Sequence, residues 1–140
     1  MSAWSSILAR FVLGGIFIVA GALKVIDPKA FARAIVDYDL APEITVPAIA
    51  VVLPWWEVVA GVLVIIGLWR LGALGSLTLM SEGFLVMGVI TLLRGLSPEC
   101  ACFGFLSDRV GPASVTLEAL LVVVSGLLLW IQVRGRGPKK

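Results

Sequence analysis

The residues of this chain that could do chemistry are few, and two cysteines separated by a single residue come first among them. Cys100 and Cys102 are the only cysteines of the 140 residues, and the chain has no histidine. A thiolate can attack the disulfide of another protein, and a second thiol close by can resolve the mixed disulfide. Two cysteines without histidine cannot complete a tetrahedral zinc site within one chain. The pair therefore predicts thiol–disulfide exchange and no metal, with a structural disulfide or two inert buried thiols as the alternatives.

Two arginines, Arg94 and Arg109, flank this cysteine segment. A nearby cation stabilises a thiolate and so lowers the pKa of the thiol. Pro98 and Gly104 disfavour a regular helix here. We therefore expect a loop in which Arg94 and Arg109 tune a redox-active cysteine pair.

Three glutamates fall within long apolar stretches of the sequence: Glu57, Glu82 and Glu118. A charged side chain inside a membrane is costly, so each indicates either a function or a packing contact. Glu57 and Glu82 lie near the middle of neighbouring stretches, so we expect their carboxylates to approach each other. A proton site, a contact to a quinone head group and a hydrogen bond to a helix carbonyl all remain open for them. Glu118 is expected close to the cysteine loop, either paired with Lys24, Arg94 or Arg109 or accepting a thiol proton.

Trp55 and Trp56 directly precede Glu57. Their flat rings could stack on a quinone, and anchoring at the membrane interface or filling the core is the alternative. A membrane pocket formed by Trp55, Trp56 and Glu57 is the prediction that follows.

The elements that position these residues are predicted from hydropathy. The chain is 60% hydrophobic and only 14% charged, with a mean hydropathy of +1.09, whereas soluble domains carry about 25% charged residues. Stretches near 7–26, 45–69, 71–93 and 113–133 are each long enough to cross a bilayer. We expect one membrane domain, 1–140, of the all-α class: an integral membrane four-helix bundle. Too few residues remain for a separate catalytic domain.

The first stretch has two cations near its ends, Arg10 and Lys24, which we expect to reach the membrane interface. A cleaved signal peptide ending near Ala20–Ala22 is the alternative for this stretch. The apolar run continues through that site, and three further spans follow it, which favours a membrane span.

The segment 27–44 is predicted to be a short amphipathic surface helix after the first span. Asp27-Pro28 ends the span, because proline cannot continue the helical hydrogen bonds. Apolar residues then recur at helical spacing, and the helix is expected to end near Ala41-Pro42. These recurring residues are Phe31, Ala34, Ile35 and Tyr38.

Four spans place both termini on one side of the membrane. The short turn at Arg70 and the basic tail Arg134–Lys140 favour termini inside a bacterial-type inner or plasma membrane. The cysteine loop would then lie outside, in an oxidising space. The net charge of +2 argues against a nucleic-acid partner, and lipid contact for the basic tail is expected instead.

The motifs along the chain resemble the MauE family of methylamine utilisation, within the wider group of DoxX-like four-span membrane proteins. The resemblance begins with the glycine-rich first span that closes in Lys24, Asp27-Pro28 and Phe31. It continues in Leu53-Pro54-Trp55-Trp56-Glu57 and is most specific in Arg94-Gly95 followed by Cys100-Ala101-Cys102-Phe103-Gly104. Ala101 stands where the family usually has glycine, and Glu82 is not part of the family pattern.

The resemblance implies a role in the redox maturation of exported proteins, alongside an exported thioredoxin-like or oxidoreductase partner. It implies Cys100 and Cys102 as the redox pair, and Glu57 with Lys24 as a membrane site. The chain would then be a possible thiol–disulfide oxidoreductase that passes electrons to a membrane acceptor such as quinone, with no covalently bound cofactor. A non-enzymatic membrane subunit or assembly factor of an oxidoreductase complex is the alternative. A small transporter or proton path built on Glu57 and Glu82 is a third hypothesis.

Overall fold

The computed structural model describes residues 3–98 and 109–135, and every regular element in these ranges is a helix. The elements are α1 (Ala3–Ile26), α2 (Pro28–Tyr38), a 3-10 turn (Glu43–Thr45), α3 (Val46–Ile66), α4 (Arg70–Leu93) and α5 (Pro112–Arg134). Four helices, namely α1, α3 with its preceding turn, α4 and α5, are long and apolar enough to cross a membrane. The prediction of an all-α, integral membrane four-helix bundle is confirmed.

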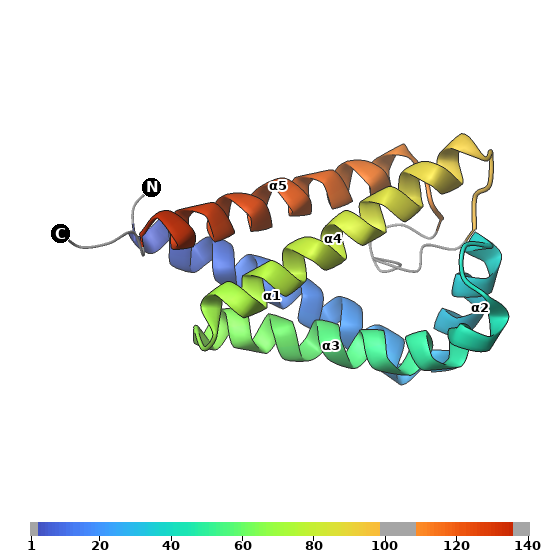
Figure 1. Cartoon of the computed structure of the whole chain (residues 1–140), viewed down its shortest axis with the longest axis horizontal. Coiled ribbons are helices and arrows are strands. Elements are labelled where there is room, and N and C mark those ends of the chain that lie inside the picture. The colour runs from blue at the N-terminus through green and yellow to red at the C-terminus, as the bar shows by residue number, and fades with distance from the viewer. Residues whose placement is uncertain (1–2, 99–108, 136–140) are drawn as a thin grey trace.

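The bundle consists of two antiparallel helix pairs. The most extensive contacts join α1 to α3 and α4 to α5. Figure 1 shows the start of α1, the α3–α4 turn and the end of α5 together at one end of the bundle, which we call the terminus end. At the opposite end, which we call the loop end, α2 follows α1 and packs against the start of α3, and the end of α4 and the start of α5 lie at this same end.

Glycines bring α1 and α3 into backbone contact. A Cβ atom built on Gly61 would stand 2.7 Å from the carbonyl oxygen of Gly14, and one built on Gly14 would stand 2.7 Å from that of Gly61. A Cβ atom on Gly21 would likewise lie 2.7 Å from the carbonyl oxygen of Pro54. Small residues permit such approach between membrane helices. This contact fixes the level at which side chains of α1 meet those of α3.

The predicted amphipathic helix is present as α2. Asp27 is its N-cap, because the carboxylate accepts a hydrogen bond from the Ala30 amide at 2.9 Å, and Pro28 occupies the first helical position. The four apolar residues that predicted the helix are the ones that it buries. They pack against Val46 and Ala50 of α3 and against Val110.

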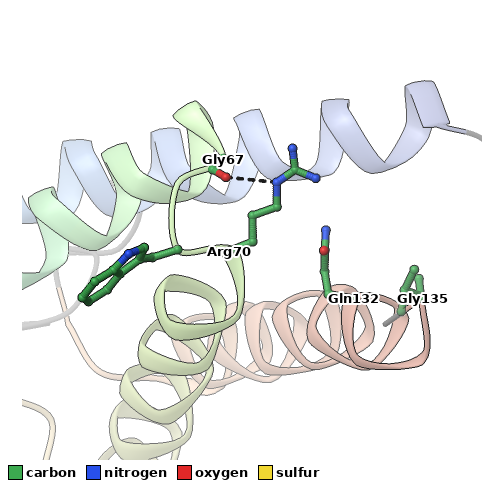
Figure 2. Close-up of a pocket in the computed structure, with 6 residues that line it drawn as sticks. Gly67, Arg70, Gln132 and Gly135 are labelled. Carbon is green, nitrogen blue, oxygen red and sulfur yellow. Dashed lines mark hydrogen bonds between the residues drawn. The ribbon is translucent and has the colours of Figure 1, made fainter. Parts of the chain in front are cut away.

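The turn between α3 and α4 begins earlier than the sequence predicts. Gly67 takes a left-handed conformation with φ of +83° and ends α3 at Ile66, not at Trp69. Arg10 closes this helix end, because its guanidinium donates to the Val64 carbonyl at 2.7 and 3.0 Å. Arg10 is therefore buried against the end of α3, at the terminus end of the bundle. Figure 2 shows the turn, with Arg70 Nε donating to the Gly67 carbonyl.

Candidate functional site

Cys100 and Cys102 lie outside the described residues, and the structure describes the two flanks of their segment. On one flank, α4 ends at Leu93 with Arg94 as its C-cap, and Gly95 follows with φ of +71°. The amide of Leu96 donates to the Thr91 carbonyl at 3.1 Å, and that of Gly95 donates to the Leu92 carbonyl at 3.0 Å. These two bonds form the Schellman arrangement that ends helices at glycine. Gly95 of the Arg-Gly motif therefore sets where the cysteine segment leaves α4.

The two flanks of the cysteine segment meet at its base. The amide of Val110 donates to the Pro98 carbonyl at 3.0 Å. Val110 is buried against α2, in the same cluster as Phe31 and Tyr38. The chain therefore leaves and returns at one place on the loop end, beside α2.

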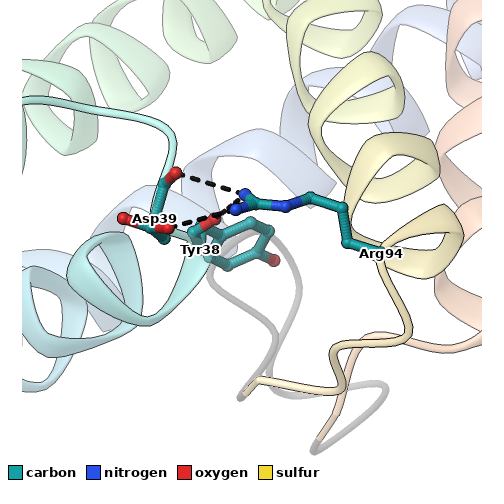
Figure 3. A network of polar contacts seen from close by, with 3 residues as sticks. All are labelled: Tyr38, Asp39 and Arg94. Atoms are coloured by element: carbon teal, nitrogen blue, oxygen red, sulfur yellow. Dashed lines mark hydrogen bonds and ion pairs between the residues drawn. The ribbon is translucent and has the colours of Figure 1, made fainter.

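Arg94 joins the end of α4 to the end of α2. One of its terminal nitrogens lies 3.1 Å from Oδ2 of Asp39, and the other donates to the Asp39 carbonyl at 3.2 Å and to the Tyr38 carbonyl at 3.4 Å. Figure 3 shows this contact. Arg109 is exposed on the other flank. Both predicted arginines thus lie beside the cysteine segment, and their effect on the thiols stays a prediction.

Within the bundle, Lys24 of α1 and Glu57 of α3 form a buried ion pair. The Lys24 ammonium nitrogen lies 2.8 Å from each carboxylate oxygen of Glu57. Glu57 is fully buried, and Lys24 is 7% exposed. The expectation that Lys24 reaches the interface is therefore wrong, and so is the expectation that Glu57 turns toward Glu82.

The direction of helical side chains explains this pairing. A side chain on a helix leans toward the N-terminus of its own helix. Because α1 and α3 run antiparallel, Lys24 and Glu57 lean toward each other along the contact that Gly21 makes with α3. The lysine thus extends into the bundle, where the Glu57 carboxylate compensates its charge.

Two aromatic rings complete the surroundings of the ammonium group. Its nitrogen lies 5.3 Å from the ring centre of Phe31 and 5.2 Å from that of Phe84. A cation this close to an aromatic face is attracted by the ring quadrupole, more strongly where water is excluded. Side chains of α2, α3 and α4 therefore surround the ammonium group that α1 carries.

The sequence reasoning did not find the two phenylalanines as parts of this site. The signal for Phe31 was present, because Asp27-Pro28 turns the chain three residues after Lys24. That turn brings the first buried residue of α2 back over the lysine. No sequence pattern indicated Phe84, because its contribution depends on how α4 is rotated against α1.

Trp55 and Trp56 do not join the Lys24–Glu57 pair, because both are more than half exposed on the outer surface of α3. Trp56 instead lines two apolar hollows between α3 and α4, of about 450 and 300 Å³. Glu82 is exposed on α4. The pocket predicted from Lys24, Glu57 and the tryptophans is therefore divided between a buried ion pair and an outer groove.

Glu118 is buried between α5 and α4. Its exposed fraction is 3%, and one carboxylate oxygen lies 2.9 Å from the place where a Cβ atom on Gly88 would stand. Lys24 and Arg94, two of its three expected partners, pair instead with Glu57 and Asp39. Within residues 3–98 and 109–135, no group of three potential ligands could hold a metal ion.

A comparison with protein families identifies what this arrangement is similar to. The family model described as methylamine utilisation protein MauE matches residues 2–131 of the chain. No curated protein and no solved structure matches it. The match includes the Lys24–Glu57 pair, the cysteine segment and its flanks.

Proposed function

This chain belongs to the MauE family, and we propose that it is a redox-associated membrane protein that exchanges disulfides with an exported thioredoxin-like partner. Cys100 and Cys102 would be the exchanging pair, during the maturation of exported proteins. The loop end would face outward, and the termini would lie in the cytoplasm.

The observation that carries this proposal is the closed base of the segment that contains both cysteines. The two cysteines are the only ones in the chain. Their segment starts and ends at one place, closed by the bond between Val110 and Pro98. Arg94, which contacts Asp39, and Arg109, which is exposed, place a guanidinium group on each flank. Positive charge favours the thiolate form that exchange requires.

The electrons that the exchange transfers come from one of the two proteins and go to the other. A thiolate of the chain attacks the partner's disulfide, a mixed disulfide forms, and the other partner sulfur leaves as a thiolate. The second cysteine of the chain, once deprotonated, attacks the mixed disulfide and closes a Cys100–Cys102 bond. The chain loses two electrons and the partner gains them. The reverse sequence oxidises the partner.

For the membrane acceptor we propose a lipid-soluble quinone on the outer surface of α3. The hollow of about 450 Å³ beside Trp56 is lined by α3 residues from Ala48 onward and by Met80 of α4. It lies along the loop-end half of α3, and the two described flanks of the cysteine segment are at the same end of the bundle. The lining is apolar and carries one large aromatic ring, which suits a flat apolar ring system. In the direction that oxidises the partner, the partner's two thiols reduce the Cys100–Cys102 disulfide, and the two thiols so formed would pass two electrons and two protons to the quinone, which becomes a quinol while the disulfide forms again.

Trapping of the mixed disulfide tests the exchange. Of the two single variants, Cys100→Ser and Cys102→Ser, one keeps the attacking thiol; in that variant the attack proceeds and the resolving step fails. A single variant that retains the attacking thiol should therefore accumulate a reductant-sensitive adduct with a thioredoxin-like protein. The double variant should form none. Ser97→Ala is a matched control, because Ser97 is exposed just before the segment and carries no thiol.

The alternative hypothesis gives a different result. If the chain is a non-enzymatic subunit or assembly factor, the double serine variant should keep its function at a normal protein level. In that case neither single variant would trap an adduct. Retained function of this kind would refute the proposed exchange.

A further inference from the structure

A cavity of about 540 Å³ opens at the terminus end, opposite the loop end. It lies between the α3–α4 turn and the last turn of α5. Its lining residues are Gly67, Trp69, Arg70, Ile131, Gln132 and Gly135. Figure 2 shows Arg70 extending from the turn, with Gln132 and Gly135 on α5 opposite it. Because α3 ends and α4 begins here, the cavity lies at the level where the bundle leaves the hydrocarbon.

Two guanidinium groups flank the glycine of this turn. A Cβ atom on Gly67 would stand 2.6 Å from Nη2 of Arg10 and 3.3 Å from Nη2 of Arg70. Arg10 uses its nitrogens for the carbonyls of Val64 and Ile65. Arg70 uses Nε for Gly67, and its two terminal nitrogens make no hydrogen bond to the described residues. The cavity therefore has a fixed guanidinium whose outer fork is available to a ligand.

Among the described residues, the helix segments around this pair of cations carry no acidic side chain. No aspartate or glutamate occurs in residues 1–26, 58–81 or 119–140. Two like charges at short distance repel each other, and an anion between or beside them lowers that energy. Arginine matches phosphate in particular, because two parallel N–H groups can bind two oxygens.

Other groups of the cavity fit the same ligand. Trp69, the N-cap of α4, makes no side-chain bond to the first-turn amides, so these amides remain available to an anion. The Gln132 side chain can donate through its amide. Trp69 and Leu68 are 82% and 57% exposed, so an apolar surface adjoins the cavity on its outer side. A ligand with a phosphate and an attached acyl chain satisfies both features.

We propose that this cavity binds the phosphate of an anionic phospholipid. Arg70 binds the phosphate with its terminal nitrogens, Arg10 adds charge behind Gly67, and the acyl chains lie along the outer surface near Leu68 and Trp69. The site is independent of the cysteine chemistry, and either proposal can fail without the other.

The test uses the full chain in nanodiscs and counts retained lipid by native mass spectrometry. Discs of phosphatidylcholine are compared with discs that also contain phosphatidylglycerol, and the thermal midpoint is measured in both. Wild type should retain phosphatidylglycerol preferentially and gain thermal stability from it. Arg70→Gln should lower that preference about tenfold, as expected for the loss of one charge-assisted bidentate contact.

Arg134→Gln is the matched control. Arg134 is also an exposed cation of the terminus end, but it lies over the Trp130 ring at 4.0 Å and does not line the cavity. This variant should keep the lipid preference. Equal losses in the two variants would mean diffuse attraction to the membrane surface and would overturn the site.

Two further arms remove the remaining ambiguities. Gln132→Trp leaves both arginines in place and fills the cavity, so it should lose the preference even if Arg70→Gln disturbs the turn. An unchanged preference in this variant would contradict the proposal. Inorganic phosphate added to phosphatidylcholine discs should give no comparable stabilisation. Stabilisation equal to that by phosphatidylglycerol would assign the cavity to a soluble anion and overturn the lipid assignment.

Discussion

At the scale of single residues, Lys24 and Glu57 both lose their contact with water and form a short ion pair instead. Both carboxylate oxygens lie 2.8 Å from the same nitrogen, and two phenylalanine rings lie within 5.3 Å of it. Removing one partner of a buried ion pair leaves the other charge uncompensated, which costs about 3–5 kcal/mol. Replacing both partners by apolar residues avoids that cost.

We therefore expect Glu57→Gln to lower the free energy of unfolding by about 3 kcal/mol. The double variant Lys24→Met with Glu57→Leu should lose much less. Unfolding by a denaturing detergent, followed by circular dichroism, measures both. If the double variant is as unstable as Glu57→Gln, then packing, and not the uncompensated charge, determines the stability at this point.

Removing the charge of Glu82 should be favourable, in contrast to removing that of Glu57. Glu82 is exposed in the middle of α4 and makes no hydrogen bond or ion pair within the described part of the chain. A charged residue at the centre of a membrane helix costs about 2–3 kcal/mol of insertion free energy. Glu82→Leu should therefore increase the inserted fraction of α4 in a translocation assay. Leu79→Glu, one turn away and 71% exposed, is the control and should decrease it. A loss of folded protein in Glu82→Leu would show that another molecule covers this carboxylate.

At the scale of elements, the glycine contact between α1 and α3 holds the ion pair in place. A methyl group at Gly61 would collide with the Gly14 backbone, whereas one at the neighbouring Gly15 would meet nothing within 4 Å. We expect Gly61→Ala to destabilise the protein by about 1–3 kcal/mol, because backbone atoms cannot move aside as a side chain can. Gly15→Ala should be neutral or slightly stabilising, since alanine is the better helix former. The same unfolding experiment distinguishes them, and equal effects would contradict the close helix contact.

Hydropathy predicted which segments of the chain form helices. The four spans and the buried face of α2 are where the apolar patterns indicated them. The end of α3 was misplaced because the residues after Gly67 are apolar, and hydropathy does not report a left-handed glycine.

The candidate site was harder to predict, because it depends on which helices are neighbours. Neighbours in sequence suggested Glu57 with Glu82, yet α3 packs most extensively on α1. Helix rotation then directs Glu57 inward and leaves Trp55 and Trp56 outside. A single sequence contains the residue types of the ion pair but not the rotation that brings them together.

At the scale of the whole molecule, four spans place Trp4 and Ser97 at opposite ends of the bundle. Both are exposed, so each can report its own side of the membrane as a single cysteine, with Cys100 and Cys102 replaced by serine. With the proposed orientation, Ser97→Cys should react with an impermeant maleimide in intact cells. Trp4→Cys should react only after permeabilisation. The reverse pattern would invert the orientation, and labelling of both from outside would contradict four spans.

The two helix pairs also determine how the chain is assembled during its synthesis. The contacts of α1 and α2 with α3 connect residues that precede Gly67, so this half can pack in the bilayer while α4 is still inside the ribosome. The second half, α4 with α5, then inserts as a hairpin. Phe84 of α4 is the last group to reach Lys24, and the cation becomes enclosed only when the halves dock. Glu57 compensates the charge within the first half, and the second half adds only the aromatic ring that completes its enclosure.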